Sequence, residues 1–302
     1  MINQLLRSLN CRHYSTSVKK ITTSTENIYG LSSVLCAIHS KKRKLKQLYI
    51  QDQLESDSIQ QIVSKCQSLD IPLKRMDKGK LNNMTMNKPH QGVVLKATQL
   101  QPIELNSLDS LSTLENTYTA TLPSLKALST VTFKKPINRF PFWIALDQVQ
   151  DPQNLGSILR TAHFFGVDGV LICHKNSAPL SPAVSKVSSG AMELMDIYTT
   201  KNLVKFLNAS KEQGWQIIGT DLESTINLND YIKSIPKDDD QPRILVFGNE
   251  GAGLRTNVKR CCNPLISIPS FNQQLQHEGY VDSLNVGVSI GVLVHSLLSC
   301  QK

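Results

Sequence analysis

Apolar residues recur with a regular period in two parts of the chain, and the first of these parts spans residues 27–98. Residues 32–40 (SSVLCAIHS) and 58–69 place apolar side chains at helical spacing, which predicts two helices. Residues 48–52 (LYIQD) and the glycine-led segment 90–95 (HQGVVL) are short apolar runs that predict strands. The pattern therefore predicts a small α/β domain.

The second regular part, residues 141–302, alternates apolar runs with helical patterns. Strands are predicted at 143–149, 167–173, 215–221 and 243–250. Helices are predicted from about 154, at 182–191, at 201–213 and from about 284. Such alternation is typical of a parallel sheet with helices on both faces. Because these sheets bind ligands beyond the carboxyl ends of their strands, functional residues are expected in the loops that follow the strands.

Residues 99–140 lie between the two parts and are rich in Leu, Ser and Thr without a clear period. We expect a linker there, with one or two helices near 108–130.

The first 25 residues contain four basic residues and no acid, and they can place Leu5, Leu6 and Leu9 on one face of a helix. This composition is typical of a mitochondrial transit peptide. A disordered basic tail that contacts RNA is the alternative.

Positive charge is concentrated in the first half of the chain. The net charge is +9; residues 27–98 hold 12 Lys or Arg against 5 Asp or Glu, whereas residues 141–302 hold 13 against 15. A basic region of this kind favours a nucleic-acid partner, and a solvated basic surface is the alternative. Five residues of one short run are the predicted phosphate contacts: Lys41, Lys42, Arg43, Lys44 and Lys46.

The seven cysteines form no CxxC pair and show no spacing typical of metal ligands. This argues against a disulfide scaffold and against a zinc or other metal site, and it favours reduced thiols. Every apolar run is shorter than the roughly 18 residues that a membrane span needs, so no span is predicted.

Three polar segments follow or precede predicted strands and helices: residues 151–160 (DPQNLGSILR), 247–254 (FGNEGAGL), and the pair 266–269 (ISIP) with 283–292 (SLNVGVSIGV). Taken singly, each has a structural interpretation; Asn154, for example, is suited to cap a helix. The glycines around Glu250 would let a backbone approach a ligand closely, but they match neither a Walker loop nor GxGxxG. A nucleotide-dependent dehydrogenase is therefore excluded.

In this order and spacing, NLGSILRTAHFFGVDGVLI, VFGNEGAGL and SIP…SLNVGVSIGVL resemble the three signature motifs of the SpoU/TrmH-like branch of the SPOUT methyltransferases. Residues 27–98 resemble that family's small L30e-like substrate-binding domain. The resemblance implies an α/β fold in which residues 141–302 form a parallel-sheet SPOUT methyltransferase domain with a carboxy-terminal trefoil knot. The L30e-like RNA-binding domain precedes it, with residues 1–25 as transit peptide and 99–140 as linker.

The resemblance also implies an activity: S-adenosylmethionine-dependent methylation of a ribose 2′-hydroxyl. With the transit peptide, it points to a guanosine of large-subunit ribosomal RNA in the mitochondrial matrix. Two alternatives stay open, a transfer RNA 2′-O-methyltransferase and a non-catalytic RNA-binding ribosome-assembly factor of the same fold. The family resemblance further implies a homodimer through the methyltransferase domain and no requirement for a metal or a membrane.

Residue roles follow from the motif match. Cofactor-binding positions are expected at Gly248, Ile268 and Leu284, and polar active-site positions at Asn154, Arg160, Glu250, Ser283 and Asn285. An arginine at the position of Arg160 has been proposed as a general base in the family, but a guanidinium stays protonated in proteins. We therefore expect Arg160 to bind the target phosphate and stabilise the developing alkoxide, with Glu250 holding its guanidinium.

The chain departs from the family pattern at two places. Gly287 stands where the family often has Ser or Ala, and residues 270–282 are longer than the usual loop.

Overall fold

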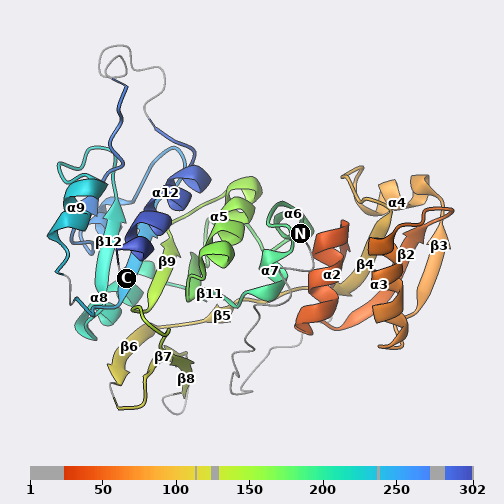
Figure 1. The fold of residues 1–302 in the computed structure, drawn as a ribbon, viewed down its shortest axis with the longest axis horizontal. Coiled ribbons are helices and arrows are strands. Elements are labelled where there is room, and N and C mark those ends of the chain that lie inside the picture. Colours follow the sequence, from red (N-terminus) through yellow and green to blue (C-terminus); the bar gives the residue numbers. More distant parts are fainter. Residues whose placement is uncertain (1–23, 113, 124–128, 237–238, 273–282, 301–302) are drawn as a thin grey trace. The chain divides into compact units, whose positions relative to one another are not determined.

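A computed structural model describes residues 24–112, 114–123, 129–236, 239–272 and 283–300 (Figure 1). The transit peptide predicted at 1–25 lies almost wholly outside the described residues, and so does most of the 270–282 loop. The described chain forms two compact units. Unit 1 comprises the residues up to Pro102 together with Pro179–Asp196, and unit 2 comprises Ile103–Ala178 and the residues from Ile197 onward.

Unit 1 contains a four-stranded sheet in the order β1 (Thr25–Tyr29), β4 (Val93–Thr98), β2 (Leu45–Gln51) and β3 (Leu73–Met76). Its first helices are α2 (Leu31–Ser40), α3 (Asp57–Gln67) and α4 (Lys78–Met84). Alternate strand residues such as Leu48 and Ile50 are fully buried in a core with α2 and α3. This confirms the predicted small α/β region; β1 was not predicted, because its first three residues are polar.

Two short helices from the second half of the chain, α6 (Pro182–Val187) and α7 (Ala191–Leu194), also belong to unit 1. The hydroxyl of Ser33 in α2 donates to the carbonyl of Ser185, 3.0 Å away. The sequence pattern predicts a single domain over residues 141–302, and the structure differs at these two helices. The difference arises from polar contacts between residues about 150 positions apart, which periodicity does not show.

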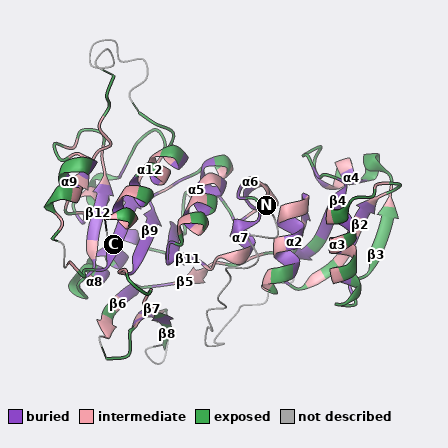
Figure 2. Cartoon of the chain, in the orientation of Figure 1, coloured by how far each residue is buried: buried purple, intermediate pink, exposed green. Residues whose placement is uncertain are grey.

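Unit 2 is built on a seven-stranded sheet in which every pairing is parallel. Its strand order is β14 (Leu265–Ile266), β12 (Gln216–Thr220), β13 (Arg243–Phe247), β9 (Phe142–Leu146), β10 (Gly169–Cys173), β11 (Ile197–Thr200) and β5 (Ile103–Glu104). The helices are α5 (Pro152–Phe165), α8 (Leu203–Glu212), α9 (Leu228–Ser234), α10 (Thr256–Lys259) and α12 (Val286–Ser299). Strands β9, β10 and β13 are buried at every position, and Figure 2 shows β9 in the buried colour. The predicted parallel sheet is confirmed.

The stretch at 99–140 is more structured than predicted. It supplies β5 to the large sheet and forms a separate antiparallel sheet of β6 (Ser107–Ser112), β7 (Thr117–Leu122) and β8 (Ser129–Lys134). The helices predicted near 108–130 are therefore wrong. Residues 117–122 (TYTATL) alternate with period two, and Tyr118 and Ala120 point into the core. Tyr118 stacks on Phe133 at 4.9 Å and accepts a hydrogen bond from the indole of Trp143.

Across the part of the chain that the structure describes, no helix is long and apolar enough to cross a membrane. The same residues contain no group of three side chains suited to hold a metal ion.

Candidate active site

Three sequence segments meet at the carboxyl edge of the large sheet in unit 2. The amide Nδ2 of Asn285, which precedes α12, donates to Oδ1 of Asn154 on α5 at 2.9 Å. Nδ2 of Asn154 in turn donates to Oε1 of Glu250, which lies in the loop after β13, at 3.0 Å. We call this series the amide–carboxylate chain. It joins residues from all three motifs, and it spans 131 positions in sequence between Asn154 and Asn285.

The direction of these hydrogen bonds is determined by the two ends of the amide–carboxylate chain. At one end Oδ1 of Asn285 accepts from the backbone N–H of Gly287, which can only donate. At the other end, an ionised Glu250 carboxylate can only accept. The amide of Asn154 must therefore turn its oxygen toward Asn285 and its nitrogen toward Glu250. Every hydrogen bond of the amide–carboxylate chain therefore joins one donor to one acceptor.

The start of α5 explains why Asn154 is available for this role. Asp151, rather than Asn154, caps the helix, because its carboxylate accepts from the backbone N–H of Gln153 at 2.8 Å. The interpretation of Asn154 as a cap is therefore wrong. Asn154 lies within the first turn and is buried. Its amide is consequently free to bond across to Glu250 and Asn285.

The loop that carries Glu250 closes on itself. Backbone bonds of 3.0 and 2.9 Å join Asn249 and Gly253 in both directions. A Cβ on Gly248 would lie 2.1 Å from the carbonyl carbon of Gly253, so this glycine is required by loop closure itself. Gly253 adopts φ 65°, a left-handed conformation that favours glycine. The closed loop presents Glu250 at its exposed tip.

The three expected cofactor positions and Ser283 lie after strands of the large sheet or just before α12. Gly248 directly follows β13, half-buried Ile268 lies two residues beyond β14, and Leu284 adjoins Asn285 with 51% of its surface exposed. Ser283 is exposed in the same short segment before α12.

Arg160 is exposed on α5, and within the described residues no hydrogen-bond or ion-pair partner contacts it. The expected contact between Arg160 and Glu250 is not observed. Both oxygens of Glu250 instead accept hydrogen bonds from amides: Oε1 from Asn154, and Oε2 from Asn249 at 3.2 Å. The guanidinium of Arg160 therefore remains available to a ligand.

Gly287 fits the close packing of α12 against α5. A Cβ there would lie 2.4 Å from Oγ of Ser157, so the larger residues that the family often has would require a local shift.

Cys173 ends β10 at this edge and was not predicted to take part. Burial, assisted by the nearby Asp147 carboxylate, raises the pKa of its thiol to about 11. The thiol is therefore protonated at neutral pH and does not act as a nucleophile.

The basic run in unit 1 divides into buried and exposed members. The side chain of Arg43 is fully buried and pairs with Glu193 and Glu26, at 2.6 Å in each case. Arg43 is therefore not a phosphate contact, and that prediction is corrected. Lys42 pairs with Asp196 at 2.7 Å. The exposed members that stay available are Lys41, Lys44 and Lys46.

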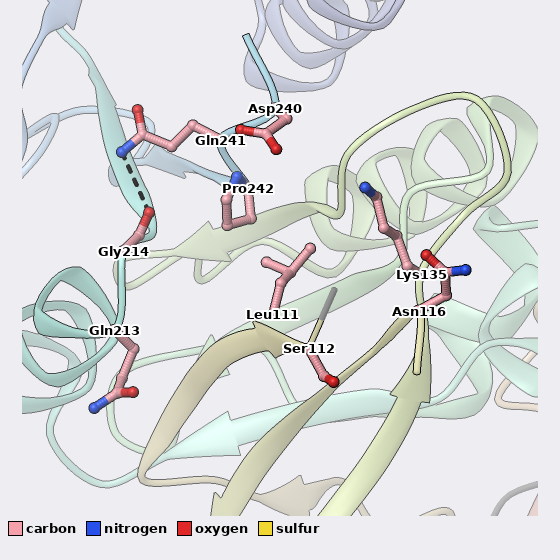
Figure 3. Close-up of a pocket in the computed structure, with 9 residues that line it drawn as sticks. All are labelled: Leu111, Ser112, Asn116, Lys135, Gln213, Gly214, Asp240, Gln241 and Pro242. Atoms are coloured by element: carbon pink, nitrogen blue, oxygen red, sulfur yellow. Dashed lines mark hydrogen bonds between the residues drawn. The ribbon is translucent and has the colours of Figure 1, made fainter. Parts of the chain in front are cut away.

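A separate cavity of about 370 Å³ lies at the other edge of the large sheet (Figure 3). Gly214 and Pro242 line it shortly before β12 and β13 begin, so it is at the amino edge. Lys135 and Asp240 contribute opposite charges to its lining, and Gln241 donates to the carbonyl of Gly214 at 3.2 Å. None of the predicted site residues lines this cavity. The candidate active site is therefore the carboxyl edge.

Comparison with known proteins gives matches in both halves of the chain. Residues 141–295 match the SpoU rRNA methylase family, and residues 27–103 match the RNA 2′-O ribose methyltransferase substrate-binding domain. A Schizosaccharomyces pombe protein named mitochondrial rRNA methyltransferase 1 is 34% identical over 293 residues, covering 95% of this chain and 94% of its own length. A Dictyostelium discoideum protein of the same name is 37% identical over 80% of this chain, and the chain spans 45% of that relative's length.

Among solved structures, the AdoMet-bound rRNA methyltransferase from Sinorhizobium meliloti has a similar fold. The TM-score is 0.64 with 21% sequence identity, over 91% of this chain and 87% of that one.

Proposed function

The chain belongs to the SpoU rRNA methylase family, and we propose that it transfers a methyl group from S-adenosylmethionine to a ribose 2′-hydroxyl of ribosomal RNA. The amide–carboxylate chain is the observation that carries this proposal, because it joins the three motifs of the family at the ligand-binding edge of the sheet. The substrate-binding match over residues 27–103 supports an RNA substrate.

The residues at this edge fit the cofactor. Exposed Leu284 and half-buried Ile268 offer apolar surface suited to an adenine ring, and half-buried Gly248 offers backbone without a side chain. When bound, S-adenosylmethionine supplies a methyl group already activated by its sulfonium. The protein's task is then to align the ribose oxygen with that methyl group and to favour loss of the hydroxyl proton.

Each polar residue of the site has a separate role in this reaction. Arg160 stays protonated, so it does not take the proton; its free guanidinium binds the phosphate of the target nucleotide and stabilises charge on the ribose oxygen. Asn154 is held by two partners and keeps the first turn of α5 in register with the Glu250 loop. Asn285 and the neighbouring Ser283 orient the segment that opens α12.

We further propose a homodimer through the methyltransferase domain. Helix α12 exposes two apolar residues at four-residue spacing, Val288 at 53% and Val292 at 37%. A second copy of the chain would cover this stripe. Light scattering of wild type and Val288→Glu tests it; a wild-type monomer would contradict the proposal.

The names of the relatives support a mitochondrial location, and the acid-free composition of residues 1–25 agrees with it. The matrix is our proposal. The carboxy-terminal trefoil knot stays a prediction of the family resemblance.

The proposed target is a guanosine of the mitochondrial large-subunit rRNA. The test is a map of ribose methylation across mitochondrial rRNA and tRNA in cells that lack the protein, complemented with wild type or Arg160→Ala. Loss of one rRNA guanosine methyl in the mutant supports the reaction and its target. Loss of a tRNA methyl instead would favour the tRNA enzyme, and no loss even in the deletion would favour the non-catalytic assembly factor.

A further inference from the structure

An ion pair between a buried carboxylate, Asp147, and a partly exposed arginine, Arg255, flanks the Glu250 loop. Asp147 directly follows β9, and its side chain is fully buried. Arg255 follows the loop and precedes α10. The guanidinium of Arg255 donates from Nε to Oδ1 at 2.8 Å and approaches the same oxygen from an NH2 group at 2.6 Å. The backbone N–H of Arg255 donates to Oδ2 at 3.1 Å.

These contacts anchor the loop at its far end, and a second contact anchors its near end. Nδ2 of Asn249 donates to the carbonyl of Gln148 at 2.9 Å. Both ends of the loop are thus attached to consecutive residues after β9, while Leu254 is buried in the core. Glu250 lies between the two anchors. Its position relative to Asn154 therefore depends on them.

The backbone at Gln148 supports a positioning role. Gln148 adopts φ 63°, a left-handed conformation that costs a non-glycine residue roughly 1–2 kcal/mol. Such strain persists where surrounding contacts hold it, and it concentrates at functional sites. Here the contacts come from its neighbour Asp147 and from Asn249.

Stability alone accounts poorly for this ion pair, because solvent around the 41% exposed Arg255 side chain screens the attraction and leaves it a small contribution. An arginine that donates to both oxygens of one carboxylate, through its guanidinium and its backbone N–H, does, however, fix geometry closely. We propose that Asp147 and Arg255 are a positioning pair for methyl transfer, which holds the 248–254 loop so that Glu250 meets Asn154. This inference rests on the proposed function.

The same strand offers a matched control at its other end. Asp168 has a fully buried side chain, pairs with Arg139 at 2.5 Å and accepts from the backbone N–H of Phe142, the first residue of β9. This pair has the same chemistry but lies at the amino edge. Its hydrogen bonds to backbone groups are with Phe140, Phe142 and Gly166, which lie at or before the starts of β9 and β10.

The experiment compares Arg255→Lys and Asp147→Asn with Arg139→Lys in the full-length enzyme. Three quantities are measured: the single-turnover rate at saturating cofactor and RNA, the dissociation constant for S-adenosylmethionine, and the melting temperature. The positioning pair predicts a rate loss on the order of 10²-fold for the first two variants, since small misplacements have effects of that size. Cofactor affinity should change far less. Arg139→Lys should lower the melting temperature and leave the rate of the folded enzyme unchanged.

A double-mutant cycle separates positioning from a loss of folded protein. In a Glu250→Gln background, Arg255→Lys should cause little further loss of rate, because both changes act on one contact. Additive losses, or equal effects of Arg255→Lys and Arg139→Lys, would overturn the positioning role while leaving the proposed function intact. A wild-type enzyme that methylates no RNA would overturn the proposed function itself.

Discussion

The two edges of the large parallel sheet use polar residues in different ways. At the amino edge, carboxylates pair with arginines close to them: Asp168 with Arg139, and Asp239 with the buried Arg243. At the carboxyl edge, polar side chains from three distant segments bond to one another mainly through neutral amides, and exposed Arg160 has no partner among the described residues. The two pairs at the amino edge satisfy these charges internally, whereas the carboxyl edge, which also holds the Asp147–Arg255 pair, leaves Arg160 available to a ligand. Predictions that separate activity from stability test this contrast.

The largest expected effect is on catalysis at the carboxyl edge. Glu250→Ala removes the acceptor that ends the amide–carboxylate chain, and we expect the methyl-transfer rate to fall on the order of 10²–10³-fold, as for removal of a preorganised polar group. Because Glu250 is exposed, the free energy of unfolding should change by only about 0.5 kcal/mol. Single-turnover kinetics and urea unfolding measure the two quantities. A large loss of stability in Glu250→Ala would contradict the contrast, because polar residues at both edges would then stabilise the fold.

At the amino edge, the expected effect is a loss of stability without a loss of rate. Asp168→Ala leaves Arg139 without its carboxylate and should lower the free energy of unfolding by about 3–5 kcal/mol. The rate per folded molecule should match wild type when measured well below the melting temperature. A slower rate with normal stability would show that this edge also takes part in the reaction.

The basic run in unit 1 also contains both kinds of charged residue, a buried arginine that is paired internally and exposed lysines that stay available to a ligand. Arg43→Met leaves Glu193 buried without its partner, so we expect a loss of about 3–5 kcal/mol in stability. Changing Lys44 and Lys46 to Gln should preserve stability, because both are exposed. It should weaken RNA binding and reduce the salt slope by about 0.7–0.9 for each phosphate that is no longer neutralised. Filter binding at several salt concentrations measures this slope; an unchanged slope would exclude these lysines as phosphate ligands.

The smallest expected effect concerns Cys173. With its thiol pKa raised from 9.0 to about 11, the thiolate fraction at pH 8 is about 10⁻³. A raised thiol pKa favours the neutral form below pH 11. Iodoacetamide at pH 8 should therefore leave this buried thiol unmodified, as peptide mass spectrometry would show. Rapid alkylation in the folded enzyme would contradict the described environment.

The sequence predicted the large sheet well, because strands buried on both faces are continuous apolar runs, as in residues 142–146. It predicted the 99–140 segment poorly, since the buried residues Tyr118 and Ala120 alternate with threonines, whose abundance resembles the composition of a linker. Local sequence preference did not determine the structure of this segment, because Tyr118 packs against aromatic residues far along the chain, such as Trp143.

The contacts of the predicted site residues could not be derived from the sequence. The motifs identified Asn154, Glu250 and Asn285, but not that they bond in series. Nor could a run of basic residues reveal that Arg43 is neutralised by Glu193, 150 positions away. The composition gives the number of charged residues, whereas the fold shows which of these residues form ion pairs within the protein.

The most direct test of the account is the single-turnover rate of methyl transfer by Asn154→Ala beside Asn202→Ala. Asn202 caps α8 by accepting from the backbone N–H of Lys205, so it controls for the loss of an asparagine near a helix start. The amide–carboxylate chain predicts a rate loss on the order of 10²-fold for Asn154→Ala and a wild-type rate for Asn202→Ala. Equal rates in the two variants would contradict the claim that this chain organises the active site.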